Sequence, residues 1–156
     1  MSTPILGQPA PDFALPATGT KTVRLTDLHG RQVVLYFYPR DNTTGCTQEA
    51  QDFRDHASKF EAMNVVVLGV SRDSQRVHEG FRAKYNLPFD LLADTDSTLC
   101  HAYDVIRTKN MYGKIVLGIE RSTFLIDQEG ILQREWRKVK VKNHVQEVLK
   151  ALGAEV

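Results

Sequence analysis

The chain has 156 residues, of which 42% are hydrophobic and 25% charged, and its formal net charge is +1. This length suffices for one domain with its own core, and the near-neutral charge argues against nucleic acid or an anionic membrane as the main partner. No apolar run approaches the length of a membrane span, the N-terminus lacks a signal-peptide pattern, and two cysteines are too few for a secreted disulfide scaffold. We therefore expect a single domain over residues 1–156 and a cytoplasmic location.

The first half of the chain predicts a strand–helix–strand unit. A short strand is expected at 23–25, and the apolar run 33–38 is rich in β-branched and aromatic residues, which is typical of a buried strand. Apolar residues at helical spacing predict one helix over 45–62, and the apolar run 65–70 predicts a second buried strand. The two buried strands should be parallel and joined by a right-handed crossover.

The second half adds further helices and a hairpin. In the first of these helices we expect Val77 and Phe81 to face inward. The predicted elements are a helix at 74–85, a strand at 87–92, a short helix around 97–103, a loop at 104–119, a hairpin of 121–127 with 131–138, and a helix at 143–152. This order predicts an α/β protein with a thioredoxin-like fold, in which helices flank a central mixed β-sheet.

The neighbours of Cys46 place it in the first turn of a helix that follows a buried strand. Pro39 ends the strand because proline cannot donate to a ladder, and residues 41–45 are typical of turns and helix N-caps. The free N–H groups and the dipole of a helix N-terminus favour a thiolate, which is the nucleophilic form. Ligands also bind at this end of the strands in open α/β sheets. The alternative is that Cys46 is a small buried hydrophobic residue.

Spacing excludes several other chemistries. A dithiol oxidoreductase needs a second cysteine where this chain has Thr43 or Glu49, and a phosphatase loop needs arginine where it has Asp52. The histidines and cysteines show no closely spaced pairs of the kind that bind zinc, and no glycine-rich phosphate loop is present. We interpret the five histidines as surface or packing residues: His29, His56, His78, His101 and His144.

The pattern Pro39-x-x-x-Thr43-x-x-Cys46, within residues 36–47, resembles the active-site motif of peroxiredoxins. More narrowly, the chain is similar to the peroxiredoxin Q, or bacterioferritin comigratory protein, subfamily. The similarity covers nearly the whole chain and also includes Gly7–Phe13, Met111–Lys114 and Gly118–Asp127.

This resemblance implies a role for each matched residue. Cys46 would be the peroxidatic cysteine, which attacks a peroxide oxygen and becomes sulfenic acid. Thr43 would hydrogen-bond the thiolate and the peroxide, and Pro39 would shield the thiolate from water. Arg121 would stabilise negative charge at the sulfur, with Glu49 orienting it; the alternative for Arg121 is a solvated cation at a strand end. The resemblance implies no metal, haem or other cofactor.

The chain departs from the subfamily pattern at two positions. Many members have a resolving cysteine where this chain has Gln51, and many have proline where it has Thr44. Cys100 is the only other cysteine, and we interpret it as a packing residue, with a resolving role as the alternative. We therefore expect a one-cysteine cycle rather than an internal disulfide between Cys46 and Cys100.

The resemblance also implies substrates and partners. Hydrogen peroxide and organic hydroperoxides would be the substrates, and an external thiol system, thioredoxin or glutathione with glutaredoxin, would be the reductant. A monomer is expected from the subfamily. A redox sensor that signals through oxidation of Cys46 to a partner is the alternative to an enzyme.

A basic run near the C-terminus raises a nucleic-acid hypothesis. Trp136 lies among five cations, and an aromatic residue in a basic strip can stack on bases. Because Val139 and Val141 alternate with lysines, we favour instead a strand with one solvated face. The cations are Arg134, Arg137, Lys138, Lys140 and Lys142.

Overall fold

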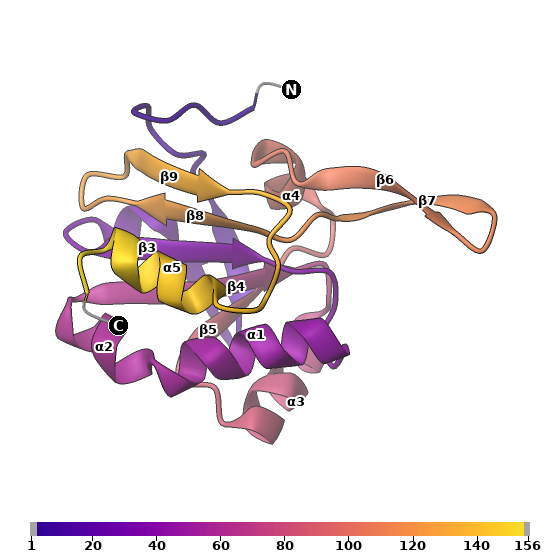
Figure 1. The fold of residues 1–156 in the computed structure, drawn as a ribbon, viewed down its shortest axis with the longest axis horizontal. Helices are drawn as coiled ribbons and strands as arrows, with labels where there is room; N and C mark the ends of the chain where they lie inside the picture. Colours follow the sequence, from indigo (N-terminus) through magenta and orange to yellow (C-terminus); the bar gives the residue numbers. More distant parts are fainter. Residues whose placement is uncertain (1–2, 155–156) are drawn as a thin grey trace.

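The computed structural model describes residues 3–154 and has a mixed seven-stranded sheet with helices on both faces (Figure 1). The ends of the predicted 1–156 domain, residues 1–2 and 155–156, lie outside the described residues. The strands are β1 Ala14–Ala17, β2 Lys21–Arg24, β3 Gln32–Phe37, β4 Val65–Ser71, β5 Asp90–Ala93, β6 Ile106–Met111, β7 Lys114–Ile119, β8 Ser122–Ile126 and β9 Leu132–Trp136. The helices are η1 Leu25–Leu28, α1 Thr44–Asp55, α2 Ala57–Ala62, α3 Gln75–Tyr85, α4 Thr98–Ala102 and α5 His144–Ala151.

Strand β3 lies near the middle of the large sheet, whose order is β2-β1-β5-β4-β3-β8-β9. It pairs in parallel with β4, and β4 pairs in parallel with β5, so the predicted strand–helix–strand unit is confirmed. On its other edge β3 pairs antiparallel with β8, and β8 pairs antiparallel with β9, which confirms the predicted hairpin. The fold is the expected α/β thioredoxin-like fold with a mixed sheet.

The two faces of the sheet are covered by separate hydrophobic clusters. Because side chains alternate along a strand, positions 33, 35 and 37 of β3 face one cluster and positions 34, 36 and 38 face the other. Helices α1, α2, α3 and α5 pack on the second face, whereas α4 and η1 pack on the first. Cys46 belongs to the second cluster and Cys100 to the first, so the sheet separates the two thiols.

The predicted helix over 45–62 is wrong as one element, because it is interrupted at His56. There φ is −108° and ψ is 11°, which lies outside the helical region. The Nδ1 atom of His56 hydrogen-bonds the carbonyl of Asp52 at 2.8 Å, while the backbone N–H of His56 donates to Phe53 instead. The side chain thus replaces the backbone hydrogen bond that would have continued the helix.

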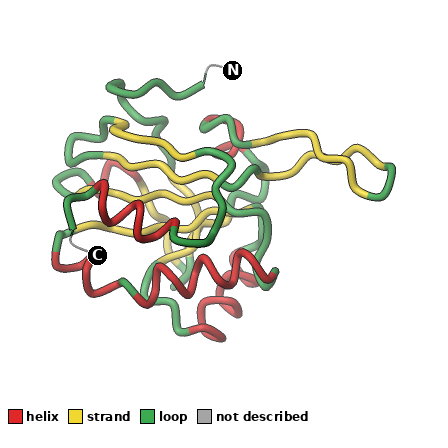
Figure 2. The backbone as a smooth tube through the Cα atoms, viewed as in Figure 1, coloured by secondary structure: helices red, strands yellow, loops and turns green. Residues whose placement is uncertain are grey.

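The predicted loop at 104–119 is also wrong, since β6 and β7 form an antiparallel hairpin. Figures 1 and 2 show this two-stranded ribbon extending away from the body of the protein. Tyr112 and Gly113 make the turn, with φ of 54° and 80°. Positive φ at both central residues is the geometry of a two-residue hairpin turn, which usually carries Asn-Gly or Asp-Gly rather than Tyr-Gly.

Helix α3 turns a different face inward from the one predicted. Phe81 is buried as expected, but Val77 is 43% exposed, and the buried position beside it is taken by His78. Helix α5 packs Val145, Val148 and Leu149 into the core, so its predicted inward face is confirmed.

The basic segment after β9 is an irregular loop, not the predicted solvated strand. Strand β9 ends at Trp136, and residues 137–143 connect it to α5 without strand pairing. Lys138 and Asn143 both have positive φ, 51° and 63°, which ends extended structure at each side of the loop. No helix in the described part of the chain is long and apolar enough to span a lipid bilayer.

Candidate active site

Cys46 lies in the first turn of α1, where the chain enters the helix from the end of β3. Residues 38–43 connect the two elements, and Thr43 is the N-cap of the helix. The backbone N–H of Cys46 is therefore among the first groups of the helix, which have no partner one turn earlier. The side chain of Cys46 is almost completely buried, in the same hydrophobic cluster as Tyr36 of β3 and Tyr38.

Arg121 reaches the thiol because of the pairing between β3 and β8. Ser122 is opposite Phe37 in that ladder, so Arg121, one residue before β8, lies where β3 ends and the loop to Cys46 begins. Its Nη2 donates to Sγ of Cys46 at 3.4 Å, and its Nη1 donates to Oε1 of Glu49 at 2.7 Å. A cation that touches the sulfur stabilises negative charge on it.

Glu49 lies one helical turn after Cys46 and is completely buried. Burial raises the pKa of Glu49 from its usual value of 4.5 to about 7, against the opposing effect of the Arg121 guanidinium. Its second oxygen, Oε2, has no hydrogen-bond partner among the described residues, and neither has the buried hydroxyl of Tyr36. Glu49 thus fixes Arg121 on one side while the guanidinium faces the thiol on the other.

Gly45 permits the close approach of Arg121 to the helix. A Cβ atom at this position would lie 3.1 Å from Nη2 of Arg121 and 4.0 Å from the side chain of Val141. Most residues would therefore displace the guanidinium from Cys46. The glycine between Thr44 and Cys46 is a part of the site that sequence spacing alone did not single out.

Thr43 and Pro39 both precede Cys46 in the sequence, but their contacts differ from the expectation. Thr43 is exposed, and its hydroxyl donates to the carbonyl of Arg40 at 2.9 Å instead of making the predicted hydrogen bond to Cys46. Pro39 is half-buried and, together with Arg40, lines a cavity of about 280 Å³. The hydroxyl must rotate away from Arg40 before it can donate to a thiolate or a peroxide.

A buried network that the sequence did not predict holds the loop between β3 and α1. Asp41 accepts a hydrogen bond from the hydroxyl of Tyr38 at 2.6 Å, and its other oxygen lies 2.6 Å from Nδ1 of His78. The second ring nitrogen of His78 lies 2.9 Å from the carbonyl of Leu92. Since Leu92 and the carboxylate only accept, His78 and Asp41 need two protons between them to make both contacts. His78 is therefore a structural residue that ties α3 and β5 to this loop.

The same network contains the set of groups most suited to a metal. Asp41, Asp73 and His78 offer three ligand atoms within 4.8 Å of one another. However, Ser71 donates to Asp73, and both nitrogens of His78 already have partners. These contacts occupy the groups in structural hydrogen bonds, so they give no support to a metal site.

Two substitutions of Asp41 should have very different effects on stability. Asp41→Ala leaves the buried His78 and Tyr38 without a partner, and we expect the free energy of unfolding to fall by about 3 kcal/mol. Asp41→Asn keeps an oxygen for Tyr38 and offers an N–H to a neutral His78, so we expect a loss below about 1.5 kcal/mol. Urea unfolding at pH 7 measures both, and equal losses would contradict this description of the network.

The surroundings of Cys100 disfavour a thiolate. It lies in α4 on the other face of the sheet, and its backbone N–H donates to the buried carboxylate of Asp94 at 2.7 Å. Burial, followed by the nearby carboxylate, raises the pKa of the Cys100 thiol above its ordinary range. Both cysteines are free thiols in the structure.

His144 opens α5 and lies buried near Arg121. Its Nε2 lies 2.8 Å from the hydroxyl of Thr123. Burial, together with the charge of Arg121, lowers the pKa of His144 from its usual 6.5 to about 4. The site therefore contains one carboxyl group, Glu49, whose pKa is raised, and one imidazole, His144, whose pKa is lowered. Both shifts favour the neutral form of the group.

The shifts of Glu49 and His144 should have opposite effects on the pH dependence of stability. Between pH 4.5 and 7 the folded chain holds a proton on Glu49 that the unfolded chain releases, so stability falls as pH rises. Between pH 4 and 6.5 the unfolded chain holds a proton on His144 that the folded chain lacks, so stability rises with pH. In the wild type these slopes largely cancel between pH 4.5 and 6.5.

As the pH rises from 4.5 to 6.5, the free energy of unfolding of Glu49→Gln should therefore increase, and that of His144→Gln should decrease. Each change should differ from the change in wild type by up to about 3 kcal/mol. Denaturant unfolding at several pH values measures these differences. Parallel curves for the two variants would show that these groups do not titrate as described.

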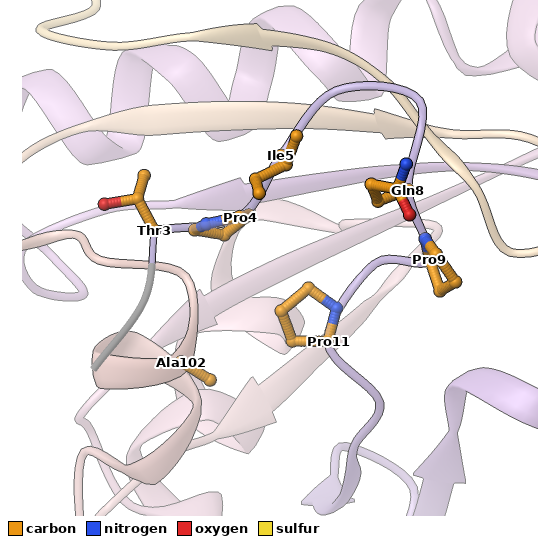
Figure 3. A pocket seen from close by; sticks show the side chains of 7 residues that line it. All are labelled: Thr3, Pro4, Ile5, Gln8, Pro9, Pro11 and Ala102. Carbon is orange, nitrogen blue, oxygen red and sulfur yellow. The ribbon is translucent and has the colours of Figure 1, made fainter.

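The cavity in Figure 3 is not part of this site. It has a volume of about 430 Å³ and lies between the N-terminal segment and α4. Its lining carries no thiol, imidazole or charged group: Thr3, Pro4, Ile5, Gln8, Pro9, Pro11 and Ala102. Nothing in this lining supplies reactive chemistry, in contrast to the groups around Cys46.

Comparison with known proteins connects this geometry to a family. The profile of the AhpC/TSA family matches residues 6–135. The chain is 54% identical over 147 residues to peroxiredoxin Bcp of Bacillus subtilis (strain 168), covering 94% of both chains. It is 49% identical over 157 residues to peroxiredoxin Bcp of Xanthomonas campestris pv. campestris, covering 99% of this chain and 98% of the relative.

Solved structures of peroxiredoxins are also similar to this chain. A cysteine-to-serine mutant of Xanthomonas campestris peroxiredoxin Q superposes with a TM-score of 0.90 at 46% identity, over 99% of this chain and 100% of that one. A structure described for the alkyl peroxide reduction activity of Xanthomonas campestris bacterioferritin comigratory protein gives a TM-score of 0.87 at 48% identity, over 90% of each chain.

Proposed function

Because the chain belongs to the AhpC/TSA family and is a thiol peroxidase of the peroxiredoxin kind, we propose that Cys46 is its peroxidatic residue. The observation that carries this proposal is the contact of Arg121 with the Cys46 sulfur, held in place by buried Glu49. The guanidinium supplies fixed positive charge where the reaction needs it. Cys100 lies on the other face of the sheet, where burial and the carboxylate of Asp94 outweigh the charge of Arg72 and raise the pKa of its thiol.

In the proposed reaction, the Cys46 thiolate attacks the outer oxygen of hydrogen peroxide or an organic hydroperoxide. The S–O bond forms as the O–O bond breaks, so the sulfur is oxidised to sulfenic acid and the peroxide is reduced. The leaving hydroxide or alkoxide takes a proton and departs as water or an alcohol. Arg121 stabilises the thiolate and the negative charge that develops on the oxygens, and Glu49 positions Arg121.

Thr43 and Pro39 act in this proposal before and during the attack. Thr43 donates to the peroxide after its hydroxyl leaves Arg40, which aligns the O–O bond with the sulfur. We propose that Pro39 limits the access of water to the thiol from the side of the loop. Tyr36 of β3 and Tyr38 belong to the same buried cluster as the thiol.

We propose a one-cysteine cycle with an external thiol as reductant. A disulfide needs the Cα atoms of both cysteines within about 7 Å, whereas here the central sheet lies between the two clusters that hold Cys46 and Cys100. A first thiol therefore forms a mixed disulfide with Cys46 and releases water, and a second thiol restores Cys46. We propose thioredoxin or a glutathione and glutaredoxin system as the source of thiols, a cytoplasmic location and a monomeric state.

Intact mass with peptide mapping tests this function. The reduced protein is treated with one equivalent of hydrogen peroxide in the presence of dimedone, which traps sulfenic acid. We expect a dimedone adduct on Cys46 and an unmodified Cys100, followed by peroxide turnover when thiol is added. An unreacted Cys46 would overturn the peroxidatic assignment, a Cys46–Cys100 disulfide would overturn the one-cysteine cycle, and oxidation without turnover would favour a redox sensor.

A further inference from the structure

A cationic cleft adjoins the candidate active site at the end of β9. Two neighbouring cavities, of about 470 and 430 Å³, share Trp136 and Glu147 in their linings, and we call them together the Trp136 cleft. Glu147 is the only carboxylate in these linings, which contain six cations. The cations are Arg134, Arg137, Lys138, Lys140, Lys142 and Lys150.

This concentration of positive charge is not a property of the whole chain, whose net charge is +1. Arg137 is already engaged, because it donates to the backbone carbonyls of Asp104 and Tyr103. By contrast, the exposed side chains of Lys138, Lys140 and Lys142 form no ion pair with any residue within 3–154. Three free ammonium groups on one short loop attract an anion to the cleft.

The loop that carries these lysines packs directly on the site. The backbone N–H of Val139 donates to the carbonyl of Arg121 at 3.0 Å. The side chain of Val141 approaches to 4.0 Å of the Cβ position at Gly45, the residue before Cys46. Lys138, Lys140 and Lys142 belong to the same loop as these two valines, and together with Val139 they line the cavity beside His144.

The dimensions of the cleft favour a small molecule. Each cavity falls in the range of small-ligand sites, about 300–1,000 Å³. Trp136 and Val139 provide apolar surface beside the lysines, which suits a ligand with an apolar stem and an anionic end. A nucleic acid would need a longer cationic track than this loop provides.

We propose that the Trp136 cleft binds the carboxylate of small molecules that react at Cys46. The proposal rests on the proposed function, because Cys46 must be the residue that meets peroxide and thiol. Two sources carry this chemistry: a carboxylate-bearing thiol that reduces the sulfenic acid, and a hydroperoxide of a fatty acid. Lys138, Lys140 and Lys142 would pair with the carboxylate while the reacting atom lies at Cys46.

Matched pairs of reactants test the cleft in the full-length protein. For the thiol, the rate constants for sulfenic acid reduction by 3-mercaptopropionate and by cysteamine are measured and expressed as a ratio. For the peroxide, the same ratio is taken for linoleic acid hydroperoxide and its methyl ester. In the triple variant K138Q/K140Q/K142Q we expect at least one ratio to fall about tenfold. The control K84Q/K114Q, which neutralises exposed lysines elsewhere, should leave both ratios unchanged.

The outcome identifies the source of the carboxylate. A fall in the thiol ratio assigns the cleft to the reductant, and a fall in the peroxide ratio assigns it to the substrate. If neither ratio falls more than about twofold, the proposal is overturned. It is also overturned if the triple variant differs from wild type only in its binding of a single-stranded oligonucleotide. Failure of hydrogen peroxide to oxidise Cys46 in the wild type would instead remove the proposed function itself.

Discussion

Replacing Cys46 by serine should lower the rate constant for peroxide reduction by at least about 10³-fold, because the variant lacks the thiolate that attacks the O–O bond. The hydroxyl of serine is a far weaker nucleophile at neutral pH, and no other thiol can take over the position. The rate is measured by competition for hydrogen peroxide under conditions in which the reductant is not limiting.

Cys100→Ser is the matched control, and its turnover should stay within about twofold of wild type. Cys100 lies on the other face of the sheet, and both its backbone N–H and its thiol interact with the carboxylate of Asp94, to which a serine hydroxyl can also donate. Loss of thiol-driven turnover in Cys100→Ser, with normal oxidation of Cys46 by peroxide, would make Cys100 the resolving residue. The helix α1 would then have to unwind during each cycle.

The position of Cys46 could be predicted from the sequence because strong local signals agree there. The buried strand, the proline that ends it and the cap residues before the helix all concern neighbouring positions. The hairpin of β6 and β7 was missed because its turn has Tyr112-Gly113 in place of a usual turn pair. The break at His56 was missed for a similar reason, since a side chain there competes with the backbone.

The partners of the thiol could not be predicted from local pattern. Arg121 lies beside Cys46 only because β8 pairs with β3 in a particular register, and single-strand periodicity does not contain that register. Resemblance to a family supplied Arg121, but it did not supply the bond between Asp41 and His78, which joins a loop to a distant helix. Likewise, alternation of valine and lysine predicted a strand where positive φ at Lys138 produces a loop.

Replacing Arg121 by methionine should have the second large effect, and it should act on both rate and stability. Removal of the cation from the sulfur should lower the rate constant for peroxide about 10²- to 10³-fold. It also leaves the carboxyl of Glu49 buried without its partner, which should reduce the free energy of unfolding by about 3 kcal/mol at pH 8, where that group would otherwise be ionised. Stopped-flow oxidation and urea unfolding of the same preparation measure the two effects.

The double variant R121M/E49Q separates catalysis from stability. Glutamine removes the buried charge, so the double variant should recover most of the stability that R121M loses at pH 8. It should not recover the rate, because no cation faces the Cys46 sulfur in either variant. If the rate returned together with stability, Arg121 would act only by holding the fold. If the single variant R121K kept both the rate and the stability of wild type, a charge near the sulfur would be sufficient without the fork of the guanidinium. If R121K kept the stability but not the rate, donation to both Cys46 and Glu49 would be required.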